Sequence, residues 1–191
     1  MATLSQLARV AIVGTSCAGK STLARALVDL LDTPRIELDA NYWGPNWTPI
    51  DGEIFRKQIE ELTSRPRWIC DGNYSIVRDL VWQRASAIVW LNYSLPVVFS
   101  RALRRTLKRC MCRSPLFAGN RETFRQSFLS RDSILLWVLR THGRHQREYP
   151  KRFAEAVHTH LHVVELRSEA DAKRFLLGIR RALSHGGRLL R

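Results

Sequence analysis

The chain has 191 residues, of which 45% are hydrophobic and 25% charged; this composition excludes intrinsic disorder and predicts a single domain over residues 1–191. Lys and Arg number 31 against 17 Asp and Glu, and the formal charge of +14 predicts a polyanionic partner: nucleotide phosphates, nucleic acid or both. No stretch reaches the roughly 18 apolar residues of a membrane span and no secretory signal precedes the first apolar run, so we expect a cytoplasmic protein without membrane contact.

Five short, mostly apolar runs predict strands. They are Ala8–Val13, Arg35–Leu38, Trp68–Cys70, Ala87–Leu91 and His162–Leu166. Helices are predicted after four of them: from Lys20 to Leu31, from an Asp51 cap to Leu62, over Val97–Lys108, and from the fifth strand through Leu183. Strands that alternate with helices form a parallel sheet with right-handed crossovers. The sequence therefore predicts an α/β fold with helices on both faces of the sheet.

One long segment, Cys110–Ser130, lacks periodic apolar positions and contains Pro115 and Gly119. Long irregular segments of compact domains are commonly lids or binding loops. Residues 101–150 hold 12 Lys and Arg but only three acids, so this part of the chain carries much of the positive charge. We therefore expect a small basic lid at about residues 109–131.

The residues between the first predicted strand and helix, Gly14–Ser21, match G-x-x-x-x-G-K-[S/T] at every fixed position. In such a loop the backbone amides surround phosphate oxygens, the lysine reaches the β- and γ-phosphates, and the hydroxyl binds magnesium. Lys20 and Ser21 would take the last two roles, and ATP and Mg²⁺ are the expected cofactors. The predicted nucleotide-binding residues are Gly14, Thr15, Ser16, Cys17, Ala18, Gly19, Lys20, Ser21 and Thr22.

A phosphate loop alone does not identify the phosphoryl acceptor, but further segments carry a family resemblance. They are Leu38–Trp47, Cys70–Tyr74, the arginine series from Arg101, Gly119–Glu122 and Arg131–Ser133. With the loop, they make the chain similar over nearly its whole length to the adenylate-kinase-like P-loop kinases known as DNA topology modulation (FlaR-type) proteins. The resemblance implies the P-loop NTPase fold, with a five-stranded sheet in the order 2-3-1-4-5 and substrate bound beyond the carboxyl ends of the strands.

Two carboxylates follow predicted strands. Asp39 comes after the second and Asp71 after the third, so both can face the phosphate loop across the crevice of an open α/β sheet. Asp71 would hold magnesium with Ser21, directly or through water, as its resemblance to the D-G motif of adenylate kinases implies. Asp39 would orient and deprotonate an acceptor hydroxyl. A helix cap or a strand-end turn is the alternative role for either acid.

Aromatic and polar side chains cluster near these carboxylates. Rings in loops can stack on a base or another flat group, although they also fill the seam between a sheet and its helices. Arg56, on the helix after the second predicted strand, would bind an acceptor phosphate or simply face solvent. The predicted substrate-binding residues in this part of the chain are Tyr42, Trp47, Arg56, Asn73, Tyr74 and Arg78.

Arg101 and Arg105 are four residues apart on one predicted helix and share a face. The resemblance implies that this face opens into the lid, where one guanidinium covers the base and another neutralises the transferring phosphoryl. Arg121, Arg125 and Arg131 are further candidates to reach the substrate when the lid closes. An ordinary surface charge is the alternative for each of these arginines.

The chain departs from the family pattern at one position. Asn92 stands at the end of the fourth predicted strand, where members of the group commonly have an acid. If that acid supports the metal, Asn92 weakens the magnesium site; if it anchors a loop, Asn can replace it. We favour the anchoring role because Asp71 remains available.

These features predict an ATP-dependent phosphotransferase of the nucleoside-monophosphate-kinase class, acting by positioning and charge neutralisation beneath a lid. The acceptor is a nucleotide or another small hydroxyl or phosphate compound. One alternative is a nucleic-acid-associated NTPase or polynucleotide kinase, suggested by the charge and the family's label. Another is a non-catalytic nucleotide-binding regulator. The sequence leaves open the acceptor, the choice between ATP and GTP, and the oligomeric state.

Overall fold

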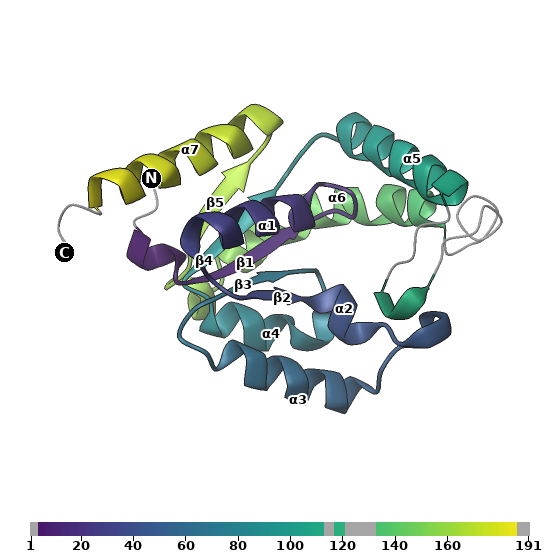
Figure 1. Ribbon diagram of the computed structural model, residues 1–191, viewed down its shortest axis with the longest axis horizontal. Helices are drawn as coiled ribbons and strands as arrows, with labels where there is room; N and C mark the ends of the chain where they lie inside the picture. Colours follow the sequence, from purple (N-terminus) through teal and green to yellow (C-terminus); the bar gives the residue numbers. More distant parts are fainter. Residues whose placement is uncertain (1–3, 113–116, 121–132, 187–191) are drawn as a thin grey trace.

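The five predicted strands form one parallel sheet in the order β2-β3-β1-β4-β5 (Figure 1). The computed structural model describes residues 4–112, 117–120 and 133–186. The strands are β1 Arg9–Gly14, β2 Arg35–Glu37, β3 Trp68–Asp71, β4 Ala87–Leu91 and β5 His162–Leu166. Each bound lies within one residue of its prediction, and the α/β class and strand order are confirmed.

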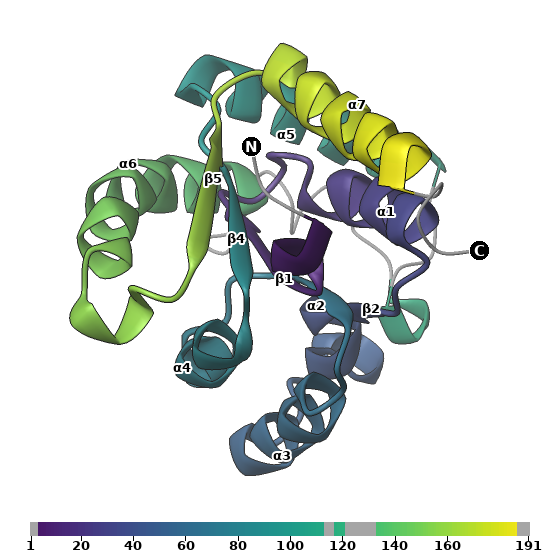
Figure 2. The same cartoon turned by 90° about the vertical axis from the view of Figure 1, so that its left-hand side faces the viewer.

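Helices cover both faces of the sheet (Figure 2). The helices are α1 Lys20–Leu31, α2 Leu38–Tyr42, α3 Gly52–Thr63, α4 Ser75–Arg84, α5 Leu95–Cys112, α6 Ile134–Phe153 and α7 Glu169–Gly186. On β1, Val10 and Ile12 pack in a core with α1, α5 and α7, whereas Ala11 and Val13 pack in a second core with α3 and α4. This alternation is the period-2 geometry of a strand buried on both faces.

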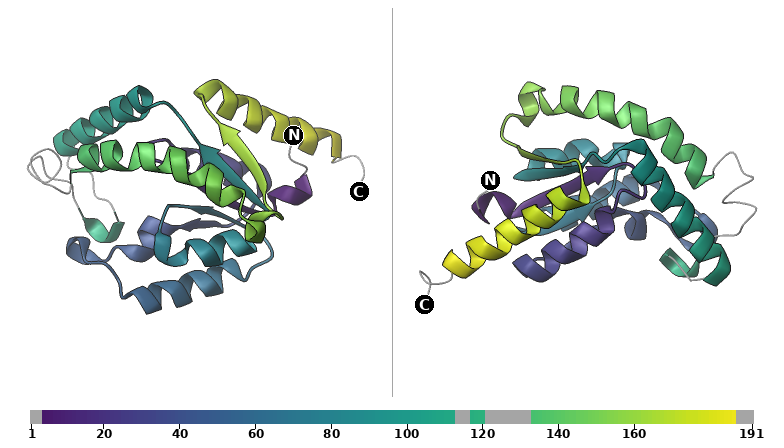
Figure 3. Two further views of the ribbon diagram at one scale, coloured as in Figure 1. Left: turned by 180° about the vertical axis from the view of Figure 1, so that it is seen from behind. Right: turned by 90° about the horizontal axis from the view of Figure 1, so that it is seen from above.

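Helix α6 was not predicted as a whole, and it joins the two cores. It runs beside α5 and reaches back along the sheet towards β5 (Figure 3), so Val138 lies in the first core and Tyr149 in the second. Its buried positions have helical spacing, but they include Thr141, His142 and His145. Because the buried face is partly polar, the apolar pattern is too weak to reveal the helix.

Three other points of the structure differ from the prediction. Leu38 begins α2 instead of ending β2, and α4 was missed because several of its residues are charged or polar. The predicted irregular segment begins too early, since residues 110–112 still belong to α5. Residues 117–119 form a short 3-10 helix, η3, but most of the predicted lid lies outside the described residues.

The carboxyl ends of β1, β2 and β3 lie together, on the side of the molecule where α2 is found (Figure 1). The register brings Ile12 of β1 and Glu37 of β2 level with Asp71 on β3. The predicted phosphate loop and both predicted carboxylates therefore extend from one edge of the sheet. Across the residues that the structure describes, no helix is long and apolar enough to cross a membrane.

The predicted cap of α3 is confirmed and can be tested. The Asp51 carboxylate accepts hydrogen bonds from the backbone amides of Glu53 at 2.9 Å and Ile54 at 3.2 Å. We expect Asp51→Ala to lower the free energy of unfolding by about 1 kcal/mol, measured by urea denaturation, because these amides lose their acceptor. Asp51→Ser retains a cap and should be close to wild type. Equal stability of the alanine variant and wild type would contradict this account.

Candidate active site

The phosphate loop connects β1 to α1 through two glycines that other residues cannot replace without strain. Gly14 has a φ of 147°, and a Cβ there would lie 2.7 Å from the carbonyl oxygen of Leu91 on β4. Gly19 has a φ of 102°, in the region that L side chains rarely adopt. The loop therefore packs against β4 and turns into α1, whose first turn begins with a bond from the Thr22 amide to the Gly19 carbonyl at 3.1 Å.

Side chains from three other parts of the chain hold the loop. The Gly14 amide donates to Asn73 Oδ1 at 3.3 Å, and the Asn73 side-chain amide donates to the Gly14 carbonyl. Arg101 on α5 donates to the Ala18 carbonyl at 2.8 Å. Thr15 Oγ1 and His142 Nδ1 on α6 are 3.2 Å apart. The loop is thus fixed by groups distant in sequence.

Lys20 and Arg105 bring positive charge to the mouth of this loop. The Lys20 ammonium donates to the Gly14 carbonyl at 2.9 Å and to the Thr15 carbonyl at 3.2 Å. Burial lowers the pKa of Lys20, and the charge of Arg105 acts in the same direction, against nearby acidic groups such as Asp39. The Arg105 Nε is buried without a hydrogen-bond partner in the described structure. A phosphate oxyanion would satisfy both cations.

Ser21 and Asp71 meet as predicted. The Ser21 hydroxyl donates to Asp71 Oδ2 at 2.8 Å, and Asp71 is only 3% exposed. Arg35, at the start of β2, donates to Asp71 Oδ1 at 2.8 Å and to Oδ2 at 3.0 Å, and also pairs with Glu37 at 2.9 Å. The sequence analysis missed Arg35. A charged residue in a short, mostly apolar strand was the available signal, because a partly buried charge needs a partner.

Asp39 lies at the surface end of an aromatic cluster. The Tyr74 hydroxyl donates to Asp39 Oδ1 at 2.7 Å. Burial, and then the charge of Asp39, raises the pKa of Tyr74, so the phenol stays protonated and holds the carboxylate as an acceptor. The rings of Tyr42 and Tyr74 are 4.6 Å apart, and both contact the buried Phe55. Packing is therefore at least part of the role of these rings.

Trp47 lies farther out, beyond the end of α2. Its ring contacts Trp43 at 5.8 Å, and its backbone amide donates to Asn120 Oδ1 at 3.0 Å. Asn120, which is buried next to η3, also donates to the Gly44 carbonyl at 2.8 Å. Asn120, near the middle of the predicted lid, therefore attaches it to the segment that follows Asp39.

The other predicted arginines have different surroundings. Arg56 is not directed to the loop: it forms an ion pair with Asp79 on α4, with contacts of 2.8 and 2.5 Å. Arg78 lies over the Trp82 ring, 5.8 Å from its centroid. Besides holding the loop, Arg101 pairs with Glu169 on α7. Arg121, Arg125 and Arg131 lie outside the described residues.

Asn92, directly after β4, forms side-chain hydrogen bonds with β5 and α6. Its side-chain amide donates to Glu165 on β5 at 2.7 Å, and its oxygen accepts a bond from Gln146 on α6 at 3.2 Å. These contacts support the anchoring role at the end of β4.

Helix α6 supplies site residues that the sequence analysis did not name. His145 is 8% exposed, and its ring stacks on Tyr149 with centroids 4.9 Å apart and planes 5° apart. Burial lowers the pKa of His145 to about 4, and the positive charges of Lys20, Arg144 and Arg78 add to the shift. The imidazole is therefore neutral near pH 7. The sequence analysis predicted no helix at His142 and His145, and their three-residue spacing was the available signal for this face.

Comparisons with known proteins support the fold. No protein-family model and no curated protein matches the chain. Shikimate kinase from Acinetobacter baumannii in complex with shikimate aligns over 98% of both chains with 16% identity and a TM-score of 0.56. Shikimate kinase from Bacteroides thetaiotaomicron aligns over 92% of this chain and 98% of its own, with 16% identity and a TM-score of 0.53. These matches show a shared P-loop kinase fold; they do not confirm the FlaR-type resemblance.

Because Arg35 and Asp71 form a largely buried ion pair, we expect the free energy of unfolding to depend strongly on both residues. Replacing Arg35 with Met leaves the Asp71 carboxylate buried without its counter-ion, so we expect the free energy of unfolding to fall by on the order of 3 kcal/mol in urea denaturation. Adding Asp71→Asn should recover part of this loss because it removes the uncompensated charge. A double variant no more stable than Arg35→Met would contradict this explanation.

The lowered pKa of His145 should make the stability of the folded protein sensitive to acid. Its pKa of about 4 in the folded protein lies below the unfolded value of about 6.5, so the unfolded state takes up the proton first and stability falls as pH drops from 6.5 towards 4. We expect this one group to account for up to about 3 kcal/mol of the loss. His145→Phe, which keeps a ring beside Tyr149, should lose less stability between pH 7 and pH 4.5 in urea denaturation.

The control is His185→Gln, which changes an exposed histidine on α7 and should follow the wild-type pH dependence. Equal losses in wild type and His145→Phe would show that His145 does not control the acid transition.

Proposed function

We propose that this protein is an ATP-dependent phosphotransferase of the nucleoside-monophosphate-kinase class, which transfers the γ-phosphoryl group to a small acceptor positioned beside Asp39. The observation that carries the proposal is the fixed phosphate loop: Lys20 and the unpartnered Nε of Arg105 lie close to each other at its mouth. The fold shared with proteins named as kinases supports the same reaction type. The finer resemblance to FlaR-type proteins agrees with this proposal.

The oxygen donors present suit magnesium. Ser21 and Asp71 offer a hydroxyl and a carboxylate 2.8 Å apart, the ligand chemistry that Mg²⁺ prefers, and would hold the ion. Both Asp71 oxygens also accept bonds from Arg35, which favours a contact through water. When bound, the ion would supply charge neutralisation at the phosphate oxygens.

The chain's own groups account for the remaining chemistry. The loop amides, Lys20 and Arg105 bind the phosphates and stabilise negative charge that develops during transfer. Asp39, held by Tyr74, accepts the proton of the acceptor hydroxyl. The hydroxyl oxygen of the acceptor then forms a bond to the γ-phosphorus, while the bond between that phosphorus and the ADP oxygen breaks. A basic lid over about residues 109–131 would exclude water from this reaction. We place the lid and the site in a single domain of a cytoplasmic protein.

A non-catalytic regulator is less favoured because Asn92 is used as an anchor, while Ser21 and Asp71 are in contact. Among the residues described, we find no observation beyond net charge that favours a nucleic-acid substrate.

A screen with labelled ATP tests the proposed reaction. Nucleoside monophosphates, sugars, sugar acids and short oligonucleotides are offered as acceptors, and we expect transfer to one small compound. Lys20→Met should abolish transfer. Asp39→Asn should lower kcat by about 10² to 10⁴ with little change in the KM for ATP, because general base catalysis is lost.

Asp29→Asn, at an exposed acid of α1, is the matched control and should retain activity. Binding of ATP without transfer to any member of the panel would favour the regulator, and transfer to oligonucleotides alone would favour the polynucleotide kinase.

A further inference from the structure

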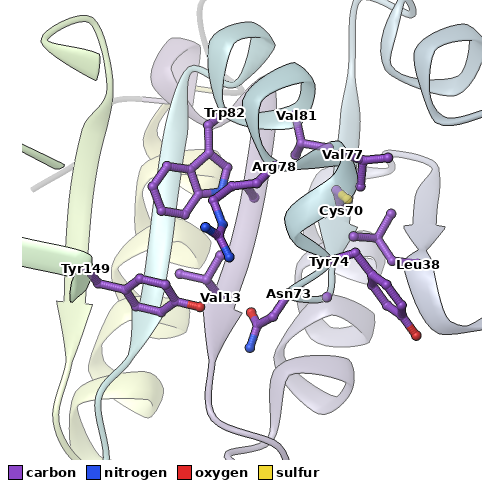
Figure 4. A pocket seen from close by; sticks show the side chains of 12 residues that line it. Val13, Leu38, Cys70, Asn73, Tyr74, Val77, Arg78, Val81, Trp82 and Tyr149 are labelled. Carbon is purple, nitrogen blue, oxygen red and sulfur yellow. The ribbon is translucent and has the colours of Figure 1, made fainter. Parts of the chain in front are cut away.

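A pocket beside the phosphate loop contains groups that the mechanism above does not use. Its polar members are Asn73 and Tyr74 at the end of β3, Arg78 on α4 and Tyr149 on α6, and Ala11, Val13 and Cys70 form an apolar floor. Figure 4 shows the Arg78 guanidinium extending past Trp82 into the space between the Tyr149 hydroxyl and Asn73. Two elements far apart in sequence thus place hydrogen-bond donors in one pocket.

Arg78 is a partly buried arginine without an acidic partner among the described residues. Within residues 4–112, 117–120 and 133–186 it forms no ion pair, and its guanidinium lies over the Trp82 ring, 5.8 Å from the ring centroid. Lys20, Arg144 and Arg78 all lower the pKa of the nearby His145, so the charges around this ring are positive. Glu148 is the acid that acts on Tyr149, and it is shared with Arg152 at 3.8 Å. A partly buried guanidinium in such surroundings favours an oxyanion.

Tyr149 is a suitable second donor. It is 1% exposed, and burial raises the pKa of its phenol to about 12, so the hydroxyl keeps its proton. Its ring is held by the stacked His145 on one side and lies 5.9 Å from Trp82 on another. The hydroxyl is therefore positioned by packing before any ligand binds.

The pocket lies between the two halves of the proposed active site. Tyr74 lines it and donates to Asp39, while Asn73 lines it and bonds to Gly14 of the phosphate loop. Its free volume is about 10 Å³, close to what one water molecule needs, so it admits one oxygen atom of an anion and not the whole group. The rest of a bound molecule would extend towards Asp39.

We propose that Arg78 and Tyr149 bind an oxyanion of the phosphoryl acceptor, which makes the acceptor a small hydroxylated carboxylate or a phosphate monoester. The inference rests on the proposed kinase function for the identity of its ligand. Arg78 supplies the charge and Tyr149 a neutral donor, while His145 acts as a positioning residue that holds the Tyr149 ring. The oxyanion at this end and the hydroxyl at Asp39 together orient the acceptor.

Matched acceptors test the subsite. Hydroxylated carboxylates are compared with their methyl esters, and sugar phosphates with the parent sugars, in the labelled-ATP assay. The charged member of one pair should be preferred by at least about tenfold in kcat/KM. Arg78→Gln should raise its KM about 10- to 100-fold, the loss expected for a charged hydrogen bond, with kcat and the KM for ATP little changed. Tyr149→Phe should have a smaller effect.

Arg25→Gln, at an exposed arginine of α1, is the control and should leave these constants unchanged. Equal use of the charged and neutral members, or an unchanged acceptor KM in Arg78→Gln, would overturn the proposal.

A binding measurement separates failure of the subsite from failure of the kinase function. Inorganic phosphate and, separately, acetate are titrated into the folded protein saturated with magnesium and a non-hydrolysable ATP analogue, and the His145 ring signals are followed by NMR. We expect one anion to shift these signals in wild type but not in Arg78→Gln, and the more effective anion indicates a phosphate or a carboxylate.

Such shifts without transfer to any acceptor would support the oxyanion subsite and count against the kinase. Transfer to an acceptor, with signals that neither anion moves, would support the kinase and overturn the subsite.

Discussion

The structure depends on a backbone turn that is held from outside. In the loop between β1 and α1, Asn73 and Arg101 bond to the backbone at Gly14 and Ala18, and His142 contacts the Thr15 hydroxyl. Lys20 donates its ammonium to two carbonyls of this loop, and the neighbouring Arg105 Nε has no partner within the described residues. Preorganised donors of this kind are effective in phosphoryl transfer because they need no rearrangement during the reaction.

The end of β3 couples the nucleotide side to the acceptor side. Asp71 bonds to Ser21 at the start of α1, Asn73 bonds to the loop at Gly14, and Tyr74 bonds to Asp39. Three nearby residues thus connect the predicted metal site, the phosphate loop and the proposed base. Parallel strands that end at one edge make this arrangement available, and the crevice there is where open α/β sheets bind ligands.

Local patterns predicted the strands, most helices and the phosphate loop, because each of these patterns is contained in a short stretch of neighbouring residues. The strand order came from a resemblance because order is a non-local property. Arg35 was missed because its role depends on the pairing of β2 with β3. His142 and His145 were missed because a partly polar buried face hides the helix. Arg56 was placed on the right helix, but its partner Asp79 comes from α4, which the pattern did not reveal.

Calorimetry of nucleotide binding tests the central claim most directly. Mg²⁺–ATP titrated into the folded protein should bind at a single site, and Lys20→Met should remove the binding while circular dichroism shows the fold unchanged. If neither Mg²⁺–ATP nor Mg²⁺–GTP produces binding heat in folded wild-type protein at several temperatures, the phosphate loop does not grip a triphosphate and the account is contradicted.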